Sequence, residues 1–570
     1  MPLTVRRVLP VLVAALVVAA VPAAASAAPT LSSAPTNPAS LAIVYPLTVP
    51  PTATGLLDAD TLTRYTAPLG LLTRQLDEVI DTPVAIGLDP MILTSIRVLG
   101  AAAPVTAADW LDRLTHATND VFPLAYADAD TAISAQAGAT EALEPLGFAF
   151  AVDPKNFSPP QTDTPTPTPT PTEGTGGTTP VAPPPLPTTD DLLKFDYLTS
   201  GIAWPADDTV GKADLPKLKA AGFDTAILSS TNVTTTSALA TVGGIRAVVS
   251  DNGVSNLLRA ATYAADDAAL ANALDRLVAG LGAVGDGRTV VATIDRHWPF
   301  TTMHLRDAVD RISATGAARL LPLAQVLNGA PGTGTIVNKP EKAGRSEIVT
   351  RMHADELAEQ DFSSVLAEPL ALTAPRRLAY LATLAVSWQP DADGWATTTT
   401  AFVEQSTQIV SSVQIVNSTS LLALSQSFGL PITVSNALDL PVTVYVTVDP
   451  QRPLLQVDGP VKVTVEPNSS NKAYVPAKAI TNGEVFVRVS LSSPTGVPVG
   501  TPRILKVDLQ AAWESIGTVI VVIVLVLIFG GGIVRQVLKR RRSRAARAAP
   551  PDPDSGMPTE PVPAESDPDD

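Results

Sequence analysis

The stretch between residues 246 and 296 decides the fold, because it places an amphipathic segment between two apolar runs. It reads RAVVSD (246–251), then DDAALANALDRLVAGL (266–281), then RTVVATIDR (288–296). Both runs are almost continuously apolar, which is typical of parallel strands that are covered on both faces. The middle segment repeats apolar residues at helical spacing, so the whole stretch predicts a strand–helix–strand unit.

The same alternation extends from residue 41 to about residue 327. Further apolar runs predict strands at LAIVYPL (41–47), PVAIGLD (83–89), VFPLAYAD (121–128), FAFAVD (148–153), GIAWP (201–205), TAILSS (225–230) and ARLLPLAQ (318–325). Amphipathic segments between them predict helices. Eight or nine such units fit a (β/α) barrel better than an open sheet, and two smaller α/β domains are the alternative.

A segment rich in Pro and Thr, residues 157–190, divides this α/β body into a first part (41–156) and a second part (191–330). Its sequence, FSPPQTDTPTPTPTPTEGTGGTTPVAPPPLPTTD, predicts disorder or polyproline II structure. Neither part alone has enough strands to close a barrel, so we expect the segment to be an insertion in one fold. Its Thr-Pro repeats are candidate O-glycosylation sites.

The pattern changes after residue 330. Residues 331–412 predict a loop followed by a helical section. Residues 413–510 contain short segments with alternating apolar and polar residues, such as PVTVYVTVD (441–449) and GEVFVRVSL (483–491), separated by turn residues. About seven short strands in roughly a hundred residues predict an immunoglobulin-like β-sandwich, here without cysteine.

The N-terminus has the three parts of a secretory signal peptide, residues 1–27. Arg6 and Arg7 form the basic region, residues 8–21 form an apolar run, and Ala25-Ser26-Ala27 is a cleavage site of the A-x-A kind. The apolar run is too short to span a bilayer, so we expect the signal to be cleaved.

A second apolar stretch predicts one transmembrane helix at residues 515–534, SIGTVIVVIVLVLIFGGGIV, which contains no charge. Seven cationic residues follow within residues 535–547. The positive-inside rule therefore places residues 535–570, a basic and then acidic disordered tail, in the cytoplasm. We expect a single-pass type I protein of the cell membrane, with its large N-terminal part outside.

Composition excludes several classes of protein. The net charge of −16 argues against a nucleic-acid partner, which requires a basic surface. The absence of cysteine excludes disulfides, iron–sulfur clusters and thiolate zinc sites. His297 and His304 do not have the spacing of a metal-dependent deacetylase, and no GxSxG, SxxK, HExxH or P-loop motif is present. We therefore expect no metal and no cofactor.

Chemistry-bearing residues gather at the carboxyl ends of the predicted strands, where parallel α/β folds place their ligand sites. The candidate ligand-binding residues are Asp89, Asp128, Asp130, Trp204, Asp251, Asp295, Arg296 and His297. Paired acids such as Asp128 and Asp251 suit glycoside hydrolysis, and the same acids suit the binding of a sugar or a cation. The alternative is that each Asp caps the helix that follows it.

Topology predicts that four of these acids share one side of the α/β body: Asp89, Asp128, Asp251 and Asp295. Parallel strands in one sheet run in the same direction, so residues at their ends meet at a common edge. Gathered carboxylates repel one another, and helix N-termini, Arg296, a cation or water must keep them ionised. A neutral polyol or a cation fits such a site better than an anion.

Several motifs resemble those of an uncharacterised actinobacterial protein family. The similar segments are YPLTVPP (45–51), ADTLTRYTAPLGLLTRQLD (59–77), VAIGLDPMILTSIRVLG (84–100), WLDRL (110–114), NDVFPLAYADAD (119–130), GIAWPADDTV (201–210) and AILSSTNV (226–233). The resemblance implies a signal-bearing, single-span extracytoplasmic protein, commonly encoded beside the lipid II flippase of peptidoglycan synthesis. The family has no assigned function, so the resemblance implies a cell-envelope setting and no reaction.

Two functional hypotheses follow. In the first, the body is a non-catalytic binding or scaffolding module linked to peptidoglycan or cell-wall assembly, with a glycan or a membrane protein such as the flippase as partner. In the second, the body is a barrel-type carbohydrate-active enzyme that uses acids at its strand ends.

Overall fold

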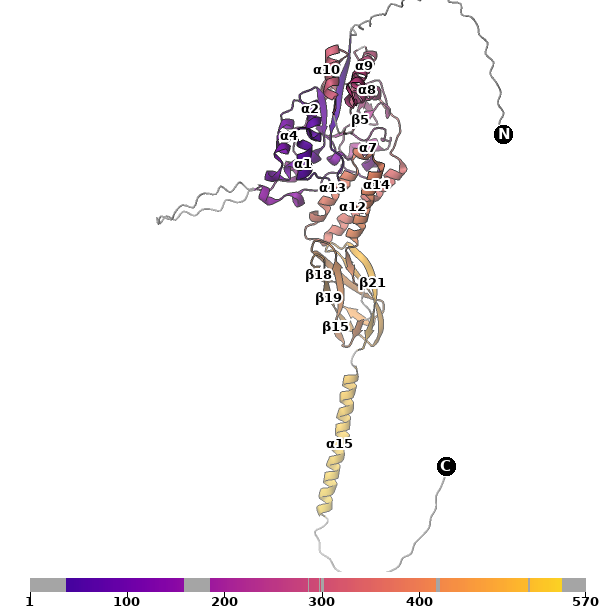
Figure 1. Ribbon diagram of the computed structural model, residues 1–570. Coiled ribbons are helices and arrows are strands. Elements are labelled where there is room, and N and C mark those ends of the chain that lie inside the picture. The colour runs from indigo at the N-terminus through magenta and orange to yellow at the C-terminus, as the bar shows by residue number, and fades with distance from the viewer. Residues whose placement is uncertain are drawn as a thin grey trace, which may run out of the picture. The chain divides into compact units, whose positions relative to one another are not determined.

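A computed structural model describes the backbone of residues 37–157, 185–285, 287–296, 298, 302–416, 421–510 and 513–545 (Figure 1). The chain forms two compact units. The first, here called the α/β unit, comprises Met1–Ala354 and Ala374–Phe402. The second, the β unit, comprises Asp355–Thr373 and Val403–Asp570. The expected signal peptide, most of the Pro/Thr-rich segment and the end of the tail lie outside the described residues.

The α/β unit is built on a ten-stranded sheet that is mostly parallel. Its strands are β1 (Ala39–Leu47), β2 (Val84–Leu88), β3 (Val121–Pro123), β4 (Ile202–Ala203), β5 (Thr225–Ser229), β7 (Leu239–Val242), β8 (Ile245–Ser250), β9 (Thr289–Thr293), β10 (Ala318–Leu320) and β11 (Gly332–Thr333). Parallel pairs run in the order β4–β5–β8–β9–β1–β2–β3, and β10 also pairs with β1. A separate antiparallel pair joins β6 (Val233–Thr234) and β12 (Thr335–Ile336).

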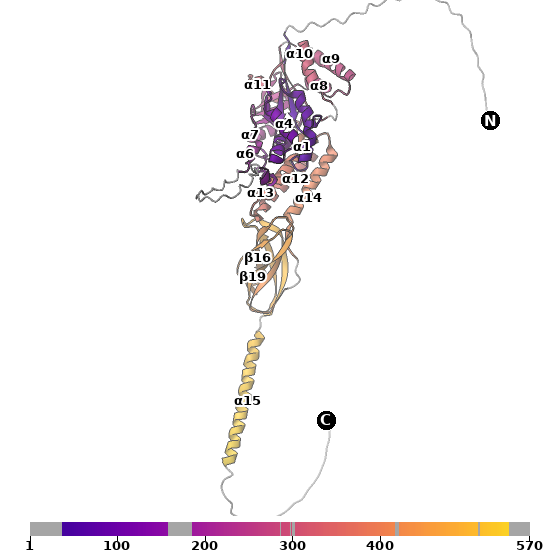
Figure 2. The same ribbon diagram turned by 60° about the vertical axis from the view of Figure 1, so that its left-hand side comes forward.

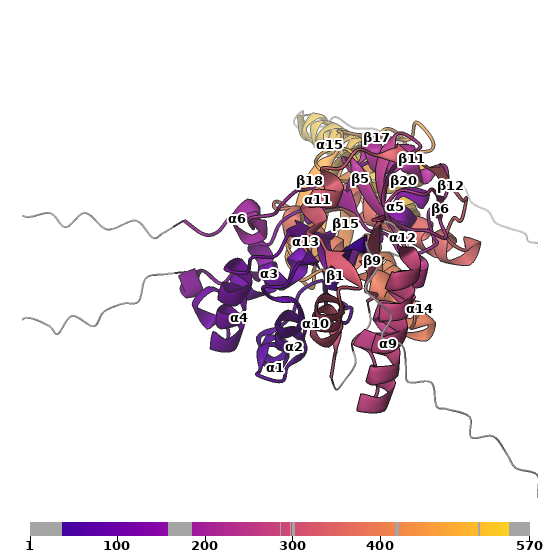
Figure 3. The same cartoon turned by 90° about the horizontal axis from the view of Figure 1, so that it is seen from above.

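Helices cover the sheet. They are α1 (Ala59–Thr66), α2 (Leu71–Val79), α3 (Pro90–Arg97), α4 (Val105–Thr115), α5 (Thr131–Gln136), α6 (Thr189–Leu193), α7 (Asp214–Ala220), α8 (Asn252–Thr262), α9 (Asp267–Val284), α10 (Leu305–Thr315) and α11 (Leu323–Leu327). Figure 3 shows α10 lying between α2 and α9 beside β1. All nine residues of β1 are buried, because the strand has neighbours on both edges and is covered on both faces.

The sheet curls around one apolar cluster. The cluster takes residues from eight strands: Ala42, Val44, Ala85, Phe122, Ile202, Ile227, Leu239, Val248 and Val291. Trp204, directly after β4, belongs to it as well. Within the described residues no ladder joins β3 to β4, and a single hydrogen bond runs from Leu198 N to Val121 O at 2.7 Å.

Strands from both sides of residues 157–190 belong to this one sheet, since β1 pairs with β9 and β10. The alternative of two separate α/β domains is therefore wrong. The strand expected at 148–153 is also wrong, because a 3₁₀ turn occupies Ala149–Ala151. The sequence did not predict β7, which runs antiparallel to β8 across a Gly243-Gly244 turn with φ +56° and +85°. Two glycines with positive φ are what such a two-residue hairpin requires.

Three longer helices contribute to both units: α12 (Ala343–Phe362), α13 (Leu370–Thr383) and α14 (Ala392–Val410). Short 3₁₀ turns lie at Gly100–Ala102, Tyr126–Asp128, Pro154–Phe157, Ser363–Val365 and Val386–Trp388. The helical section expected at 331–412 thus contains three long helices.

The β unit contains two sheets that share one hydrophobic core (Figure 2). One sheet has the order β13-β15-β19-β17 and the other β14-β21-β20-β16-β18. Their bounds are β13 (Val413–Ile415), β14 (Leu421–Ala423), β15 (Ser427–Asn436), β16 (Val442–Pro450), β17 (Leu455–Val457), β18 (Val461–Val465), β19 (Ser469–Ala479), β20 (Gly483–Ser492) and β21 (Pro498–Leu509). Buried and exposed residues alternate along β16 and β20, as the period-2 pattern predicts.

The last helix, α15, spans Trp513–Ala545. Its segment Thr518–Lys539 is long and apolar enough to cross a membrane, and none of it is buried by the rest of the chain. This segment overlaps the expected span of 515–534 and fits a single-pass membrane anchor.

Candidate functional site

A cavity of about 390 Å³ opens at the carboxyl ends of β4 and β9, within the α/β unit. It is called the Trp204 cleft here, and its lining residues are Trp204, Ala206, Asp207, Arg259, Ile294, Asp295, Arg296, Val386, Gln389 and Pro390. The carboxyl edge of a parallel sheet is where α/β folds build ligand sites. Three of the residues predicted from sequence line it: Trp204, Asp295 and Arg296.

Arg296 is held in the wall of the cleft by two neighbours. Its Nε and Nη2 donate to the two carboxylate oxygens of Asp128, each at 3.1 Å. Its guanidinium also lies 4.2 Å from the centroid of the Trp204 ring, and Nη2 donates to Trp204 O at 3.0 Å. The side chains of Arg296 and Asp128 are only 7% and 6% exposed. A bidentate pair this deeply buried fixes geometry more than it adds stability.

The backbone before Asp128 is left-handed. Ala127 and Asp128 have φ of +58° and +52°, a conformation that residues with a Cβ adopt at a cost. Burial raises the pKa of the Asp128 carboxyl, and the charge of Arg296 opposes part of that rise. The strained turn therefore places a buried acid where one arginine satisfies both of its oxygens.

Asp89 caps α3 and does not line the cleft. Its Oδ1 accepts from Met91 N and from Ala127 N, both at 2.9 Å. The side chain is buried, and burial raises the pKa of Asp89 to about 8, with the nearby Asp128 adding to the rise. Asp89 thus joins the start of α3 to the turn that carries Asp128.

Asp130 and Asp251 are helix caps as well. Asp130 accepts from Ala132 N at 2.9 Å at the start of α5, and burial raises its pKa to about 6. Asp251 accepts from Val254 N at 2.9 Å at the start of α8. The capping alternative from the sequence therefore holds for three of the predicted acids.

Asp295 differs from the other acids because it begins no helix. It shares a hydrogen bond with Tyr263, and burial is the main reason that the pKa of Tyr263 lies well above its usual value. The other oxygen of Asp295, Oδ1, has no hydrogen-bond partner among the described residues. Asp295 thus lines the cleft and has one carboxylate oxygen that is buried and unpaired.

Sequence reasoning missed two polar residues of the cleft. Arg259, on α8, donates to Thr293 O at 3.0 Å and to Asp207 at 3.2 Å. Asp207 lies three residues after Trp204 in the segment GIAWPADDTV. Its place beyond the end of the predicted strand could therefore have been predicted from the sequence. Nothing in the sequence linked Arg259 to it, because the partners are 52 residues apart.

His297 lies outside the described residues. Over the described ranges, no group of three His, Asp or Glu side chains is placed to hold a metal ion. The polar groups of the cleft are therefore two carboxylates, two arginines and the amide of Gln389, which donates to Glu341 at 3.1 Å.

The chain belongs to a family of unknown function, DUF6049, whose profile matches residues 27–565. No curated protein matches it. Similar solved structures include native alpha-2-macroglobulin of Escherichia coli, 18% identical over 18% of this chain and 7% of that one, with a TM-score of 0.15. The E. coli chaperone DraB is 16% identical over 18% of this chain and 55% of its own, with a TM-score of 0.14. Scores this low carry no argument about fold or function.

Proposed function

We propose that the protein is a membrane-anchored, non-catalytic binding module of the cell envelope. In this proposal the Trp204 cleft binds a neutral, hydroxyl-rich ligand, such as a segment of cell-wall glycan. The main support for the proposal is that most carboxylates at the strand ends already have structural partners. Asp89, Asp130 and Asp251 cap helices, and Asp128 is held at both oxygens by Arg296.

The charges of the cleft favour a neutral ligand over an anion. Both arginines already have carboxylate partners: Arg296 bonds Asp128 and Arg259 bonds Asp207. An anion would have to compete with those carboxylates. A sugar hydroxyl can instead donate to the Asp295 carboxylate and accept from the Arg259 guanidinium. The Trp204 ring is only 5% exposed and lies beneath the Arg296 guanidinium, so it supports the wall of the cleft.

A carbohydrate-active enzyme of barrel type is the second candidate. Such an enzyme needs one carboxyl group as acid and another as nucleophile or base, both facing the substrate. Asp128 and Asp251, the pair considered from sequence, each have structural partners that a reaction would have to break. Asp295 is then the main acid left to act on a substrate. Because the reaction needs two such acids, the binding role is favoured.

The setting in the cell is part of the proposal. The cationic residues after α15 favour a cytoplasmic tail and an outer position for both units. The residues at 1–27 favour export through a signal peptide. The resemblance to actinobacterial proteins encoded beside the lipid II flippase supports a role in wall assembly, with that flippase as a candidate membrane partner.

We also propose a specific fold class for each of the two units. We infer that the α/β unit is a (β/α) barrel left incomplete between β3 and β4. Support comes from the eight strands that contribute to one inner cluster and from the hydrogen bond between Leu198 and Val121. For the β unit, two sheets around a shared core support an immunoglobulin-like sandwich that acts as a spacer.

The test uses the full chain in lipid nanodiscs and a β-1,4-linked N-acetylhexosamine tetrasaccharide. Calorimetric titration measures binding, and chromatography of the same mixture after long incubation measures shorter products. The proposal expects saturable binding and no products. Release of shorter sugars by the wild type, abolished in Asp295→Asn, would establish the enzyme instead. Absence of both binding and products would reject the glycan ligand.

A further inference from the structure

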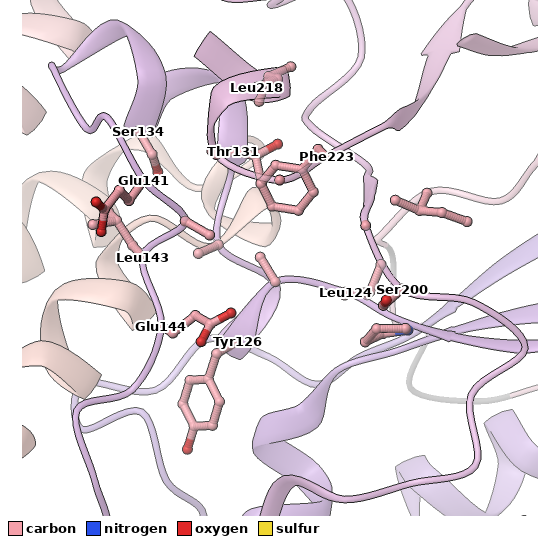
Figure 4. A pocket seen from close by; sticks show the side chains of 18 of the residues that line it. Leu124, Tyr126, Thr131, Ser134, Glu141, Leu143, Glu144, Ser200, Leu218 and Phe223 are labelled. Carbon is pink, nitrogen blue, oxygen red and sulfur yellow. The ribbon is translucent and has the colours of Figure 1, made fainter. Parts of the chain in front are cut away.

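A second cavity lies where the ladder between β3 and β4 is missing, and none of its lining residues lines the Trp204 cleft. Its volume is about 430 Å³. The walls come from the residues after β3, from α5 and the chain that follows it, from the approach to β4, and from α7. Figure 4 shows Leu124, Tyr126, Leu143, Leu218 and Phe223 around it. This space is called the β3–β4 pocket here.

Two hydroxyl groups in this apolar lining lack partners. Thr131 Oγ1 and Tyr197 Oη are inaccessible to solvent and make no hydrogen bond within the described residues. Buried hydroxyls are almost always paired, so two unpaired ones in the lining of one pocket call for a missing partner. Burial raises the pKa of Tyr197 well above its usual value, so this hydroxyl stays protonated and can donate.

The charged groups near the pocket do not suit an anionic ligand. Glu141 and Glu144 are exposed and lie on the same side of the pocket in Figure 4. The ammonium of Lys217, which also lines the pocket, already donates to Ala135 O at 2.7 Å. The charged residues of the lining are two acids and one lysine, so their net charge is negative and disfavours a carboxylate or phosphate.

We propose that the β3–β4 pocket binds the hydrocarbon chain of a neutral lipid, with an uncharged ester or hydroxyl group bonded to Thr131 and Tyr197. The apolar walls accept an acyl chain, and two hydroxyls match the few polar atoms of a neutral acylglycerol. A peptide would bring an amide N–H and C=O with every residue, and this wall offers them too few partners. The chain also carries α15, a helix suited to a bilayer, where acyl chains are abundant.

The probe is 1-monododecanoylglycerol with a diazirine in its chain, added to the full chain in nanodiscs. After irradiation, mass spectrometry locates the labelled peptides. Labels are expected in residues 124–145 and 193–223, and labels in α15 report that the probe has entered the bilayer. Unlabelled monododecanoylglycerol should compete for the pocket labels, whereas dodecanoate should compete at least about tenfold less well because it is charged.

Two variants locate the site. Leu143→Trp fills the pocket from a partly exposed position and should abolish its labels, while Leu186→Trp, outside the lining, should not. Thr131→Val removes one hydroxyl at nearly constant volume and should weaken binding roughly three- to tenfold, while Thr140→Val should not. Equal melting temperatures and unchanged binding of the tetrasaccharide verify the fold.

Three results would overturn the proposal. They are labels confined to α15, pocket labels that survive Leu143→Trp, and equal competition by dodecanoate. Crosslinking of the pocket to a co-purified protein in place of the probe would assign it to a peptide and reject the lipid.

Discussion

Arg296 bonds both carboxylate oxygens of Asp128 at 3.1 Å, across 168 residues of sequence. This pair joins the turn after β3 to the end of β9, and the same guanidinium covers the Trp204 ring. The Asp128–Arg296 pair explains why an acid at a strand end can have a structural role. Both oxygens of the carboxylate already accept hydrogen bonds from the arginine that forms the cleft wall.

Arg296→Met should destabilise the α/β unit by about 3–5 kcal/mol, because it leaves the Asp128 carboxylate buried and unpaired. The midpoint of thermal unfolding measures the change. Adding Asp128→Asn should recover more than half of the loss, since asparagine tolerates the left-handed backbone and carries no charge. Arg311→Met, which removes an exposed ion pair with Asp275, should change stability by less than about 1 kcal/mol. Equal effects at both arginines would contradict the structural role of Arg296.

Asp89 should make stability depend on pH between about 4 and 8. Its pKa is about 8 in the folded protein and close to ~3.9 when unfolded, so folding takes up a proton in this window. The stability from Asp89 is therefore complete below the window and is lost as pH rises toward 8. Asp89→Asn keeps an oxygen for Met91 N and Ala127 N, and its melting temperature should exceed that of the wild type by an amount that grows up to about pH 8 and then levels off.

An exposed cap provides the control for that pH profile. The hydrogen bond from Thr61 N lowers the pKa of Asp58, so this group titrates far below pH 6. Asp58→Asn should therefore leave the shape of the profile between pH 6 and 9 unchanged. Parallel profiles for wild type and Asp89→Asn would show that Asp89 is already ionised when folded.

Asp251 should behave as a helix cap. Asp251→Ala should cost about 1 kcal/mol, because Val254 N loses its acceptor, whereas Asp251→Asn should cost less than about 0.5 kcal/mol. Hydrogen exchange of the first turn of α8 reports the difference locally. An unchanged exchange rate in Asp251→Ala would contradict the capping role.

The apolar segment of α15 should hold the chain in the membrane. Two arginines near its centre, Val524→Arg with Val526→Arg, each cost about 2.5–3.5 kcal/mol on insertion and should move the chain to the carbonate-soluble fraction. The double change to leucine at the same positions should leave it in the pellet. Extraction of the wild type by carbonate alone would contradict the anchor.

Periodicity predicted much of the architecture. The apolar runs at 41–47, 83–89, 225–230 and 246–251 are parallel strands, because such runs bury both faces of a sheet. The run at 148–153 failed because two alanines and two phenylalanines fit a 3₁₀ turn as well as a strand. Short apolar runs of this kind do not distinguish the two.

The site was predicted less completely, because side-chain contacts between residues far apart in the sequence determine which acids line the cleft. Strand ends identified Trp204, Asp295 and Arg296, because topology brings them to one edge. The same rule selected Asp89 and Asp251, and only side-chain geometry shows that they cap helices. The pairing of Asp128 with Arg296 is a long-range contact that depends on a left-handed turn, and local sequence does not encode it.

The proposal that the Trp204 cleft is a ligand site is tested by measuring the affinity of the tetrasaccharide for two variants. Both variants are the full chain in nanodiscs. Asp295→Ala removes the acceptor of the cleft and should weaken binding about 10- to 100-fold, the loss expected for a hydrogen bond to a charged group. Asp251→Asn, which changes a cap, should bind as the wild type does. Unchanged affinity in Asp295→Ala, or a loss confined to Asp251→Asn, would contradict a ligand site at the Trp204 cleft.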